Sequence, residues 1–436
     1  MKSWNIVLER VKELHREAVN GSSYLRKESQ VDKSSIIDQW LRYAQNTEFT
    51  DLFSYVKTTQ HENYLLIKYK DLKDIFRKIP RLTEDESLEE AINRFWNSNN
   101  GFYREARSVV ICLKRMKLVL TPFRKFHNYG EGDEGEVEFV KKLIKNAGVF
   151  EVADKLDGSM QSFSYYTEED DFVYAGSGAL DPKSSWQLRK GMTYFNNSPG
   201  LQKMAKENPH LTFNAEFIDS KEFLTVIYKP EDEGLHLIGA RCKETGRQLS
   251  YAELRSLAEQ YGNRVVRTFN KTFEQILDDL KNLKAEDSEG YVVNIDGHYL
   301  KFKADDYVEL NKTIASASVN ALIKAVENNT LEDLVAKIPK AHQKRIETDL
   351  NNILNYVKIR TEEIETVWNE LPKEDRRSFF EALNKNPKAK RNERYLNKLY
   401  KGENYSVLAN DRAGSIQWVT PKEMLDYLEV EECEIK

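Results

Sequence analysis

The sequence predicts an α+β protein, with antiparallel sheets and flanking helices followed by an all-α C-terminal domain. From about residue 51 to residue 310, short apolar runs alternate with turn residues, which is typical of strands. Residues 1–50, and again those beyond 311, carry apolar residues at helical spacing. We therefore expect an N-terminal helical extension over 1–50, a mixed domain over 51–310 and a helical domain over 311–436.

The composition fits a soluble globular chain with several domains. The 436 residues are 40% hydrophobic, and 66 basic residues face 71 acidic ones, for a net charge of −5. This balance excludes a uniformly basic nucleic-acid coat but leaves room for a local basic patch. No apolar run reaches the ~20 residues that a membrane span needs. The three cysteines Cys112, Cys242 and Cys433 form no CxxC pair, which excludes a zinc motif and fits a reducing cytoplasm.

Individual elements follow from local patterns. Val7, Leu8, Val11 and Leu14 predict an amphipathic first helix and not a signal peptide. Ser250-x-x-Glu253 and Thr272-x-x-Gln275 are capping boxes that open two helices, and Asp296-Gly297 predicts a hairpin turn. Strands are predicted at 64–69, 107–113, 150–155, 161–166, 172–175, 211–218, 223–228, 235–241, 290–295 and 299–303.

The sharpest chemical signal is Lys155-Leu156-Asp157-Gly158, which follows an alternating strand. A lysine at a strand end, beside a glycine that lets a ligand approach, suits a covalent nucleophile. Its amine would have to lose a proton, which neighbouring cations or burial would favour. The alternative is a surface hairpin in which Asp-Gly is merely the turn.

Three later features strengthen this interpretation. Glu216 lies on the opposite face of a strand from Phe213, Ala215 and Phe217, and Ser288-Glu289-Gly290 enters a second apolar strand. In Tyr299-Leu300-Lys301-Phe302-Lys303 the two lysines share one face, where like charges are favourable if they meet phosphates. Taken singly, each is also compatible with a solvated strand face.

The order of these motifs, K-x-D-G, strand Glu, E-G and K-x-K, resembles that of the lysine nucleotidyltransferases, the superfamily of ATP-dependent ligases and mRNA capping enzymes. ARCKETGRQLSYAEL, KFKADDYVEL and REARSVVI followed by PFRKFHNYGE are similar to the phage-type RNA ligase 1 family of tRNA-repair ligases, over roughly residues 60–335. The resemblance implies a nucleotidyltransferase (ATP-grasp-like ligase) domain. It implies an ATP-dependent RNA ligase that joins 3′-hydroxyl and 5′-phosphate RNA ends, including those of broken tRNA.

The family also implies roles for residues at matching positions. Lys155 would carry AMP, Gly158 would contact the nucleotide, Glu216 and Glu289 would hold nucleotide and metal, and Lys301 and Lys303 would bind phosphate. The remaining nucleotide contacts would be Tyr69, Arg107, Lys125 and Tyr307. Glu332 and Asp333 correspond to an acidic metal-binding pair. The implied cofactors are ATP and Mg²⁺ or Mn²⁺, and the implied location is the cytoplasm of a bacterial or phage-infected cell, with no membrane and no protein partner evident.

The chain departs from the family pattern in places. DNA ligases and capping enzymes usually continue K-x-D-G-x-R, but here the arginine position is Met160. The strand 173–178 lacks the lysine that the family has after its first motif. A basic segment, residues 385–401, carries Tyr395 and Tyr400, and it predicts either RNA contacts or a solvated helix with core tyrosines. A DNA ligase, a capping-type enzyme and an inactive RNA-binding ligase fold remain the alternatives.

Overall fold

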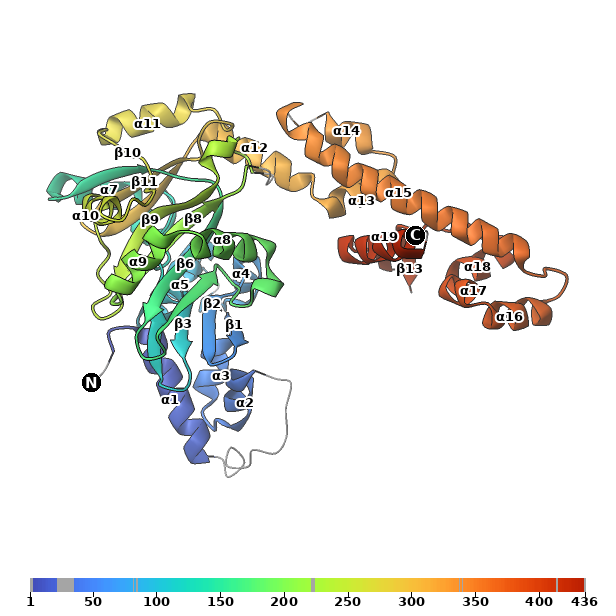
Figure 1. The fold of residues 1–436 in the computed structure, drawn as a ribbon, viewed down its shortest axis with the longest axis horizontal. Helices are drawn as coiled ribbons and strands as arrows, with labels where there is room; N and C mark the ends of the chain where they lie inside the picture. The colour runs from blue at the N-terminus through green and yellow to red at the C-terminus, as the bar shows by residue number, and fades with distance from the viewer. Residues whose placement is uncertain are drawn as a thin grey trace. The chain divides into compact units, whose positions relative to one another are not determined.

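The computed structural model describes all residues except 1–2, 22–34, 81, 84, 221–223, 337, 339, 413–414 and 435–436. The chain divides into two compact units, residues 1–308 and residues 309–436. Figure 1 shows the first in blue to yellow and the second in orange to red. Within the described part of the chain, none of the helices combines the length and the apolar character that crossing a membrane requires.

Three four-stranded antiparallel sheets organise the described residues of the first unit. The first has the order β1-β2-β3-β4, with β1 Val56–His61, β2 Tyr64–Tyr69, β3 Arg107–Cys112 and β4 Lys117–Leu120. The second has the order β7-β6-β8-β9, with β6 Ser159–Tyr166, β7 Asp171–Gly176, β8 Leu211–Ile218 and β9 Gly234–Cys242. The third has the order β10-β5-β11-β12, with β5 Phe150–Asp154, β10 Thr268–Phe269, β11 Gly290–Ile295 and β12 His298–Lys303.

Helices flank these sheets as predicted. Both capping boxes are present: Ser250 caps α10 and Thr272 caps α11. The Asp296-Gly297 turn joins β11 to β12 with φ of +49° and +87°, the left-handed conformations that a tight hairpin needs. The helices are α1 Ile6–Gly21, α2 Ile36–Tyr43, α3 Thr47–Ser54, α4 Leu72–Lys78, α5 Leu88–Glu105, α6 Gly132–Gly135, α7 Val137–Asn146, α8 Trp186–Asn196, α9 Pro199–Glu207, α10 Tyr251–Glu259 and α11 Phe273–Asn282.

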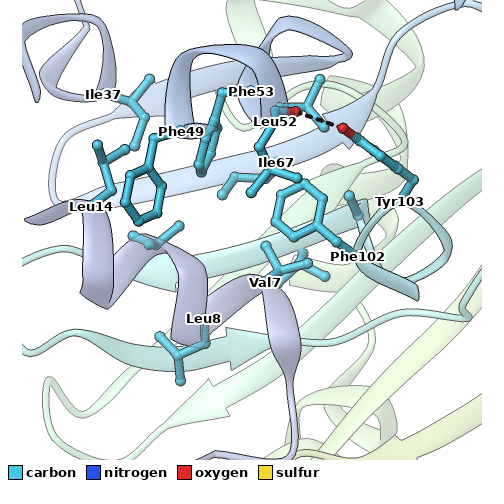
Figure 2. Close-up of a cluster of buried hydrophobic side chains, with 14 of the residues drawn as sticks. Val7, Leu8, Leu14, Ile37, Phe49, Leu52, Phe53, Ile67, Phe102 and Tyr103 are labelled. Carbon is cyan, nitrogen blue, oxygen red and sulfur yellow. Dashed lines mark hydrogen bonds between the residues drawn. The ribbon is translucent and has the colours of Figure 1, made fainter. Parts of the chain in front are cut away.

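The N-terminal helices pack on one face of the first sheet. Val7, Leu8 and Leu14 of α1 share a hydrophobic core with Ile67 of β2 and Phe102 of α5. Figure 2 shows this cluster, in which the Tyr103 hydroxyl donates to the Leu52 carbonyl at 3.1 Å. The apolar residues that predicted the first helix therefore form the face of α1 that packs on the sheet. The opposite face of the first sheet packs against the second sheet.

The second unit is helical with one exception. Its elements include a two-stranded antiparallel sheet, β13 Ala409–Arg412 with β14 Ser415–Trp418, so the prediction of an all-α domain was wrong in this detail. A hairpin of four-residue strands is too short to produce a strand pattern against a helical background. The helices are α12 Asp305–Ser316, which carries the boundary between the units, α13 Val319–Glu327, α14 Leu331–Val335, α15 Lys340–Glu370, α16 Arg376–Lys385, α17 Pro387–Arg391, α18 Glu393–Tyr400 and α19 Pro421–Glu434.

One predicted strand is absent. Residue 223 lies outside the described residues, and 224–228 form an irregular segment instead of a strand. Its backbone is held by a side chain: the Asp157 carboxylate accepts from the Thr225 and Val226 amides at 2.9 and 3.2 Å. These contacts satisfy the backbone amides without a neighbouring strand, which the apolar pattern alone does not reveal.

Candidate active site

Lys155 lies directly after β5, where the sequence predicts it. Its amide donates to the Gly290 carbonyl at 2.9 Å, which fixes it against the start of β11. Its Nζ lies 2.6 Å from Glu289 Oε2, and Lys303 Nζ lies 2.9 Å from Glu289 Oε1. One buried carboxylate, its side chain 4% exposed, therefore holds two of the predicted lysines together.

The two motif glycines are required by close approach of the backbone. A Cβ on Gly158 would lie 2.5 Å from the Phe217 carbonyl oxygen and 3.0 Å from Glu216 Cγ. Gly290 has φ of +129°, and a Cβ there would lie 2.0 Å from the Phe302 carbonyl oxygen. Glycine at each position thus lets the strands that carry the lysines and carboxylates meet.

Glu216 points away from the core of its sheet, as the alternation predicts. Phe213, Ala215 and Phe217 are buried in the core on one face, and Glu216 lines a cavity on the other. Burial raises the pKa of Glu216 to about 8, against the opposing effect of Lys155 and with the help of the Glu289 and Asp157 carboxylates. Among the described residues no hydrogen-bond donor contacts its carboxyl, which leaves it available to a ligand.

A cavity of about 300 Å³ brings the predicted residues together. Lys155, Gly158, Glu216, Arg107 and Lys301 line its polar part. Most of the other lining residues are apolar, among them Leu156, Phe126, Ile238, Val266 and Val292, and the exceptions are Asp154, Ser159 and Ser177. An apolar pocket with cations and a carboxylate at one side suits a flat base joined to phosphates.

A β-bulge aims Arg107 into this cavity. The pairing of β2 with β3 shifts between Ile67 and Lys68, and Ser108 has φ of +64°, in the left-handed region. Strict alternation would turn Arg107 to the side of Val109, in the core beneath α1, but the extra residue turns it to the other face. Its guanidinium lies 5.0 Å from the centre of the Phe126 ring and donates to the Arg124 carbonyl at 3.2 Å.

Lys301 and Lys125 add two further desolvated cations. Lys301 Nζ lies 4.7 Å from the centre of the Phe126 ring, and Lys125 Nζ lies 5.5 Å from that of Trp96. Burial and then Arg107 lower the pKa of both amines, that of Lys125 to about 8. Neither lysine has an ion pair with a carboxylate among the described residues. Buried cations without a carboxylate partner are stabilised when an anionic ligand binds beside them.

The two predicted tyrosines differ in setting. Tyr307 lies near the shared carboxylate, with Lys303 Nζ 5.4 Å from its ring centre, and burial together with Glu289 and Asp157 raises its pKa. Tyr69 ends β2 on the opposite face from the cavity and packs edge-on against Trp96 at 5.2 Å. A direct nucleotide contact for Tyr69 therefore stays a prediction.

A second, larger cavity of about 860 Å³ has a different character. It shares Phe123 and Phe126 with the first but is lined by arginines that already have carboxylate partners. Arg241 pairs with Glu105 at 2.9 Å, and Arg247 pairs with Glu253 at 3.0 Å. Because these charges are neutralised within the protein, the smaller cavity is the better candidate for an anionic ligand.

Comparison with known proteins agrees with this assignment. The family model described as RNA ligase matches residues 105–308, which include every motif from Arg107 to Lys303. Residues 105–308 belong to the RNA ligase family. A comparison with curated protein sequences gave no match.

Several solved structures are similar to the chain at low identity. An archaeal ATP-dependent RNA ligase is 15% identical with a TM-score of 0.42, over 88% of this chain and 95% of that one. A mutant RNA ligase of Naegleria gruberi with ATP and Mn is 22% identical with a TM-score of 0.32, over 40% and 55%. A putative ATP-dependent DNA ligase from Aquifex aeolicus is 15% identical with a TM-score of 0.39, over 73% and 79%. The assignment of the ligase domain rests on the family match and not on these likenesses.

The ligase domain fits a divalent cation that is bound largely through substrate. The described residues contain no group of three or more His, Cys, Asp or Glu side chains placed to hold a metal. Mg²⁺ is often held by one or two carboxylates plus substrate phosphates, and Glu216, with its raised pKa and no protein donor, has the character of such a carboxylate. Glu332 and Asp333 lie in α14 of the second unit, where Glu332 is exposed and the Asp333 side chain lies outside the described residues.

Sequence reasoning missed two contributors to the ligase site. Phe126 supports both Arg107 and Lys301, and its only signal was its place in PFRKF. Asp157 was given no role of its own within the motif, but it holds the segment 224–228, and its amide donates to the Tyr228 hydroxyl at 2.8 Å. The place of Asp157 between Lys155 and Gly158 in the K-x-D-G motif could have drawn attention to it.

In the basic segment 385–401, both tyrosines and two of the cations have partners within the second unit. Tyr395 is buried, and Tyr400 packs on Phe379 with ring centres 4.4 Å apart, so both tyrosines belong to the helical core. Arg391 pairs with Glu363 at 2.6 Å, and Lys390 pairs with Glu393 at 2.8 Å. This arrangement favours the solvated helix with core tyrosines over base stacking.

Proposed function

We propose that this ligase domain seals RNA ends through a lysyl–AMP intermediate formed on Lys155. The observation that carries the proposal is the meeting of Lys155, Glu216, Lys301 and Arg107 in one cavity whose remaining wall is mostly apolar. The apolar wall accepts the adenine, and the cations face the phosphates. The family match to RNA ligase supports the same reaction.

In the first step, Lys155 Nζ attacks the α-phosphorus of ATP. A P–N bond forms, the bond to the β-phosphate oxygen breaks, and pyrophosphate leaves. Since Lys155 pairs with Glu289 at 2.6 Å, its ammonium must give up a proton before the attack. Lys301 and Arg107 are placed to stabilise the charge that develops on the phosphoryl oxygens.

In the second step, an oxygen of the RNA 5′-phosphate attacks the AMP phosphorus, and Lys155 leaves as an amine. In the third, an RNA 3′-hydroxyl attacks the phosphorus of the adenylated end, forms the phosphodiester and releases AMP. A Mg²⁺ ion bound through phosphates and Glu216 would neutralise phosphate charge. The same cationic wall serves all three displacements, because each develops charge at phosphorus.

We also propose broken tRNA as a natural substrate and the cytoplasm as the location. The resemblance of PFRKFHNYGE and ARCKETGRQLSYAEL to tRNA-repair ligases supports the substrate. The free Cys112 and Cys242 thiols support the location. Sealing of hairpin RNAs that carry a break in the loop tests the proposed tRNA substrate directly.

A ligation assay distinguishes the candidate activities. The protein is incubated with ATP and RNA that carries a 5′-phosphate and a 3′-hydroxyl, and the products are separated on a denaturing gel. The proposal predicts joined or circular RNA with ATP and much less product with 5′-phosphorylated DNA. Covalent labelling from GTP instead of ATP would support a capping enzyme, and RNA binding without any label would support an inactive ligase fold.

A further inference from the structure

Lys68 is a further cation beside the 300 Å³ cavity that holds Lys155. It is the penultimate residue of β2, and it pairs with Arg107 in β3 on one side and with Lys57 in β1 on the other. Its neighbours Ile67 and Tyr69 pack into the core beneath α1, so its own side chain lies on the other face of the sheet, the face to which the bulge turns Arg107.

The segment that follows β7 brings this amine to the cavity wall. A Cβ on Gly178 would lie 3.7 Å from Lys68 Nζ, so the amine is within contact distance of that glycine. The preceding residue, Ser177, lines the cavity, and its carbonyl accepts from the Ser108 hydroxyl at 2.7 Å. Ser177 and Gly178 therefore connect Lys68 with the wall that Lys155 and Arg107 also line.

Lys68 carries a charge that the described part of the chain does not pair with a carboxylate. No ion pair joins it to a carboxylate among the described residues, although Asp71 lies near enough to favour the charged form. Burial has the largest effect and lowers the pKa of Lys68, and Lys57 and Arg107 lower it further. Like charges directly opposed across strands destabilise a sheet, so this arrangement is costly unless an anion enters.

We propose that Lys68 binds a phosphate of the substrate beyond the one that Lys155 attacks, and that it acts together with Arg107. The ligand chemistry is a phosphate monoester or polyphosphate oxygen, supplied by the terminal phosphates of ATP or by the RNA 5′-phosphate. Lys68 lies one strand away from Arg107, which lines the cavity while Lys68 does not, so we assign Lys68 to the next phosphate along. The identity of the ligand, ATP or RNA, rests on the proposed ligase function. The binding of a phosphate by Lys68 does not depend on that function.

Lys68→Ala and Lys68→Arg test this, with Lys73→Ala as the matched control. Lys73 is an exposed lysine on the neighbouring α4 and lines neither cavity. Three reactions are measured: lysyl–AMP formation against ATP concentration, transfer of AMP to 5′-phosphorylated RNA, and sealing of RNA that already carries the adenylate. Binding of inorganic tripolyphosphate is measured separately by thermal shift.

If Lys68→Ala raises the KM for ATP by about tenfold or more and seals adenylated RNA normally, Lys68 binds the terminal phosphates of ATP. A rise of about tenfold is the effect expected from the loss of one charge-assisted contact. Normal lysyl–AMP formation with slowed transfer to RNA assigns it to the RNA phosphate. Lys68→Arg should recover much of either loss. If all three reactions and the tripolyphosphate shift match Lys73→Ala, the inference is wrong. A wild-type protein that binds tripolyphosphate through Lys68 but forms no lysyl–AMP would instead overturn the proposed function alone.

Discussion

Two groups of cations in this chain differ in how their charge is balanced. In the ligase domain, Lys301 and Lys125 are desolvated and have no carboxylate partner among the described residues. In the second unit, Arg391 and Lys390 are exposed and paired with Glu363 and Glu393. Local sequence shows basic residues in both places, but only the first group lacks internal neutralisation. The difference teaches that the balance of charge, and not the count of basic residues, marks an anion site.

The largest expected effect comes from removing an unpaired cation. Lys301→Met or Arg107→Ala should slow lysyl–AMP formation by about 100-fold or more, the effect of losing one donor to developing charge. The melting temperature of Lys301→Met should be unchanged or higher, because a buried charge without a partner is costly. Single-turnover labelling with ATP and a thermal melt measure both. A lower melting temperature that fully accounts for lost activity would make Lys301 a structural residue.

Glu289→Gln should be the most destabilising of these changes. It removes the carboxylate that neutralises Lys155 and Lys303 at once, and we expect a loss of up to about 3 kcal/mol in the free energy of unfolding, as when one partner of a buried ion pair is removed. Urea unfolding measures it. The control is Glu381→Gln in the second unit, whose pair with Arg377 is exposed and should contribute nothing measurable. Equal effects in the two variants would contradict the contrast between the regions.

The pH dependence of stability should report Glu216. Its pKa in the folded protein is about 8 against an ordinary value of 4.5, so its stabilising contribution is complete below 4.5 and is lost as pH rises through 8. Glu216→Gln removes this loss, and its advantage in melting temperature over wild type should grow between about pH 4.5 and pH 8 and level off above pH 8. Lys125, with a pKa lowered to about 8, gives the opposite slope in both proteins, so the difference between them isolates Glu216. A difference independent of pH would show that Glu216 is ionised throughout.

The smallest effect should follow from the basic segment of the second unit. Lys388→Ala with Lys390→Ala should leave lysyl–AMP formation unchanged, since the motif residues all lie in the first unit. If the segment contacts RNA, the dependence of RNA affinity on salt should become shallower by about one unit of slope per lost phosphate contact. Filter binding over a range of salt concentrations measures this. An unchanged slope would confirm the solvated helix.

Local patterns in the sequence were enough to find the strand-borne part of the site. Lys155 follows from a strand end beside a glycine, Glu216 and Lys301 follow from alternation, and the structure places all three in one cavity. The orientation of Arg107 could not be predicted, because it depends on the bulge at Ser108, and an inserted residue leaves no mark in an alternating apolar run.

Contacts distant in sequence explain the other differences. Asp157 holds Thr225 and Val226 across some seventy residues, so 224–228 needs no strand partner, and its apolar character was misleading. Lys301 and Lys303 were expected to repel each other on a shared face. Lys303 does lower the pKa of Lys301, but among the described residues Lys303 also pairs with the Glu289 carboxylate and Lys301 pairs with none, which depends on where Glu289 enters its strand.

The most direct test of the central claim locates the AMP. Wild-type protein and Lys155→Arg are incubated with ATP and Mg²⁺ and digested, and the peptides are analysed by mass spectrometry. Arginine stays protonated and cannot attack phosphorus, while its charge can still pair with Glu289. The account predicts one AMP on the wild-type peptide that contains Lys155 and none on any peptide of the variant. AMP on another lysine, or undiminished AMP in Lys155→Arg, would contradict it.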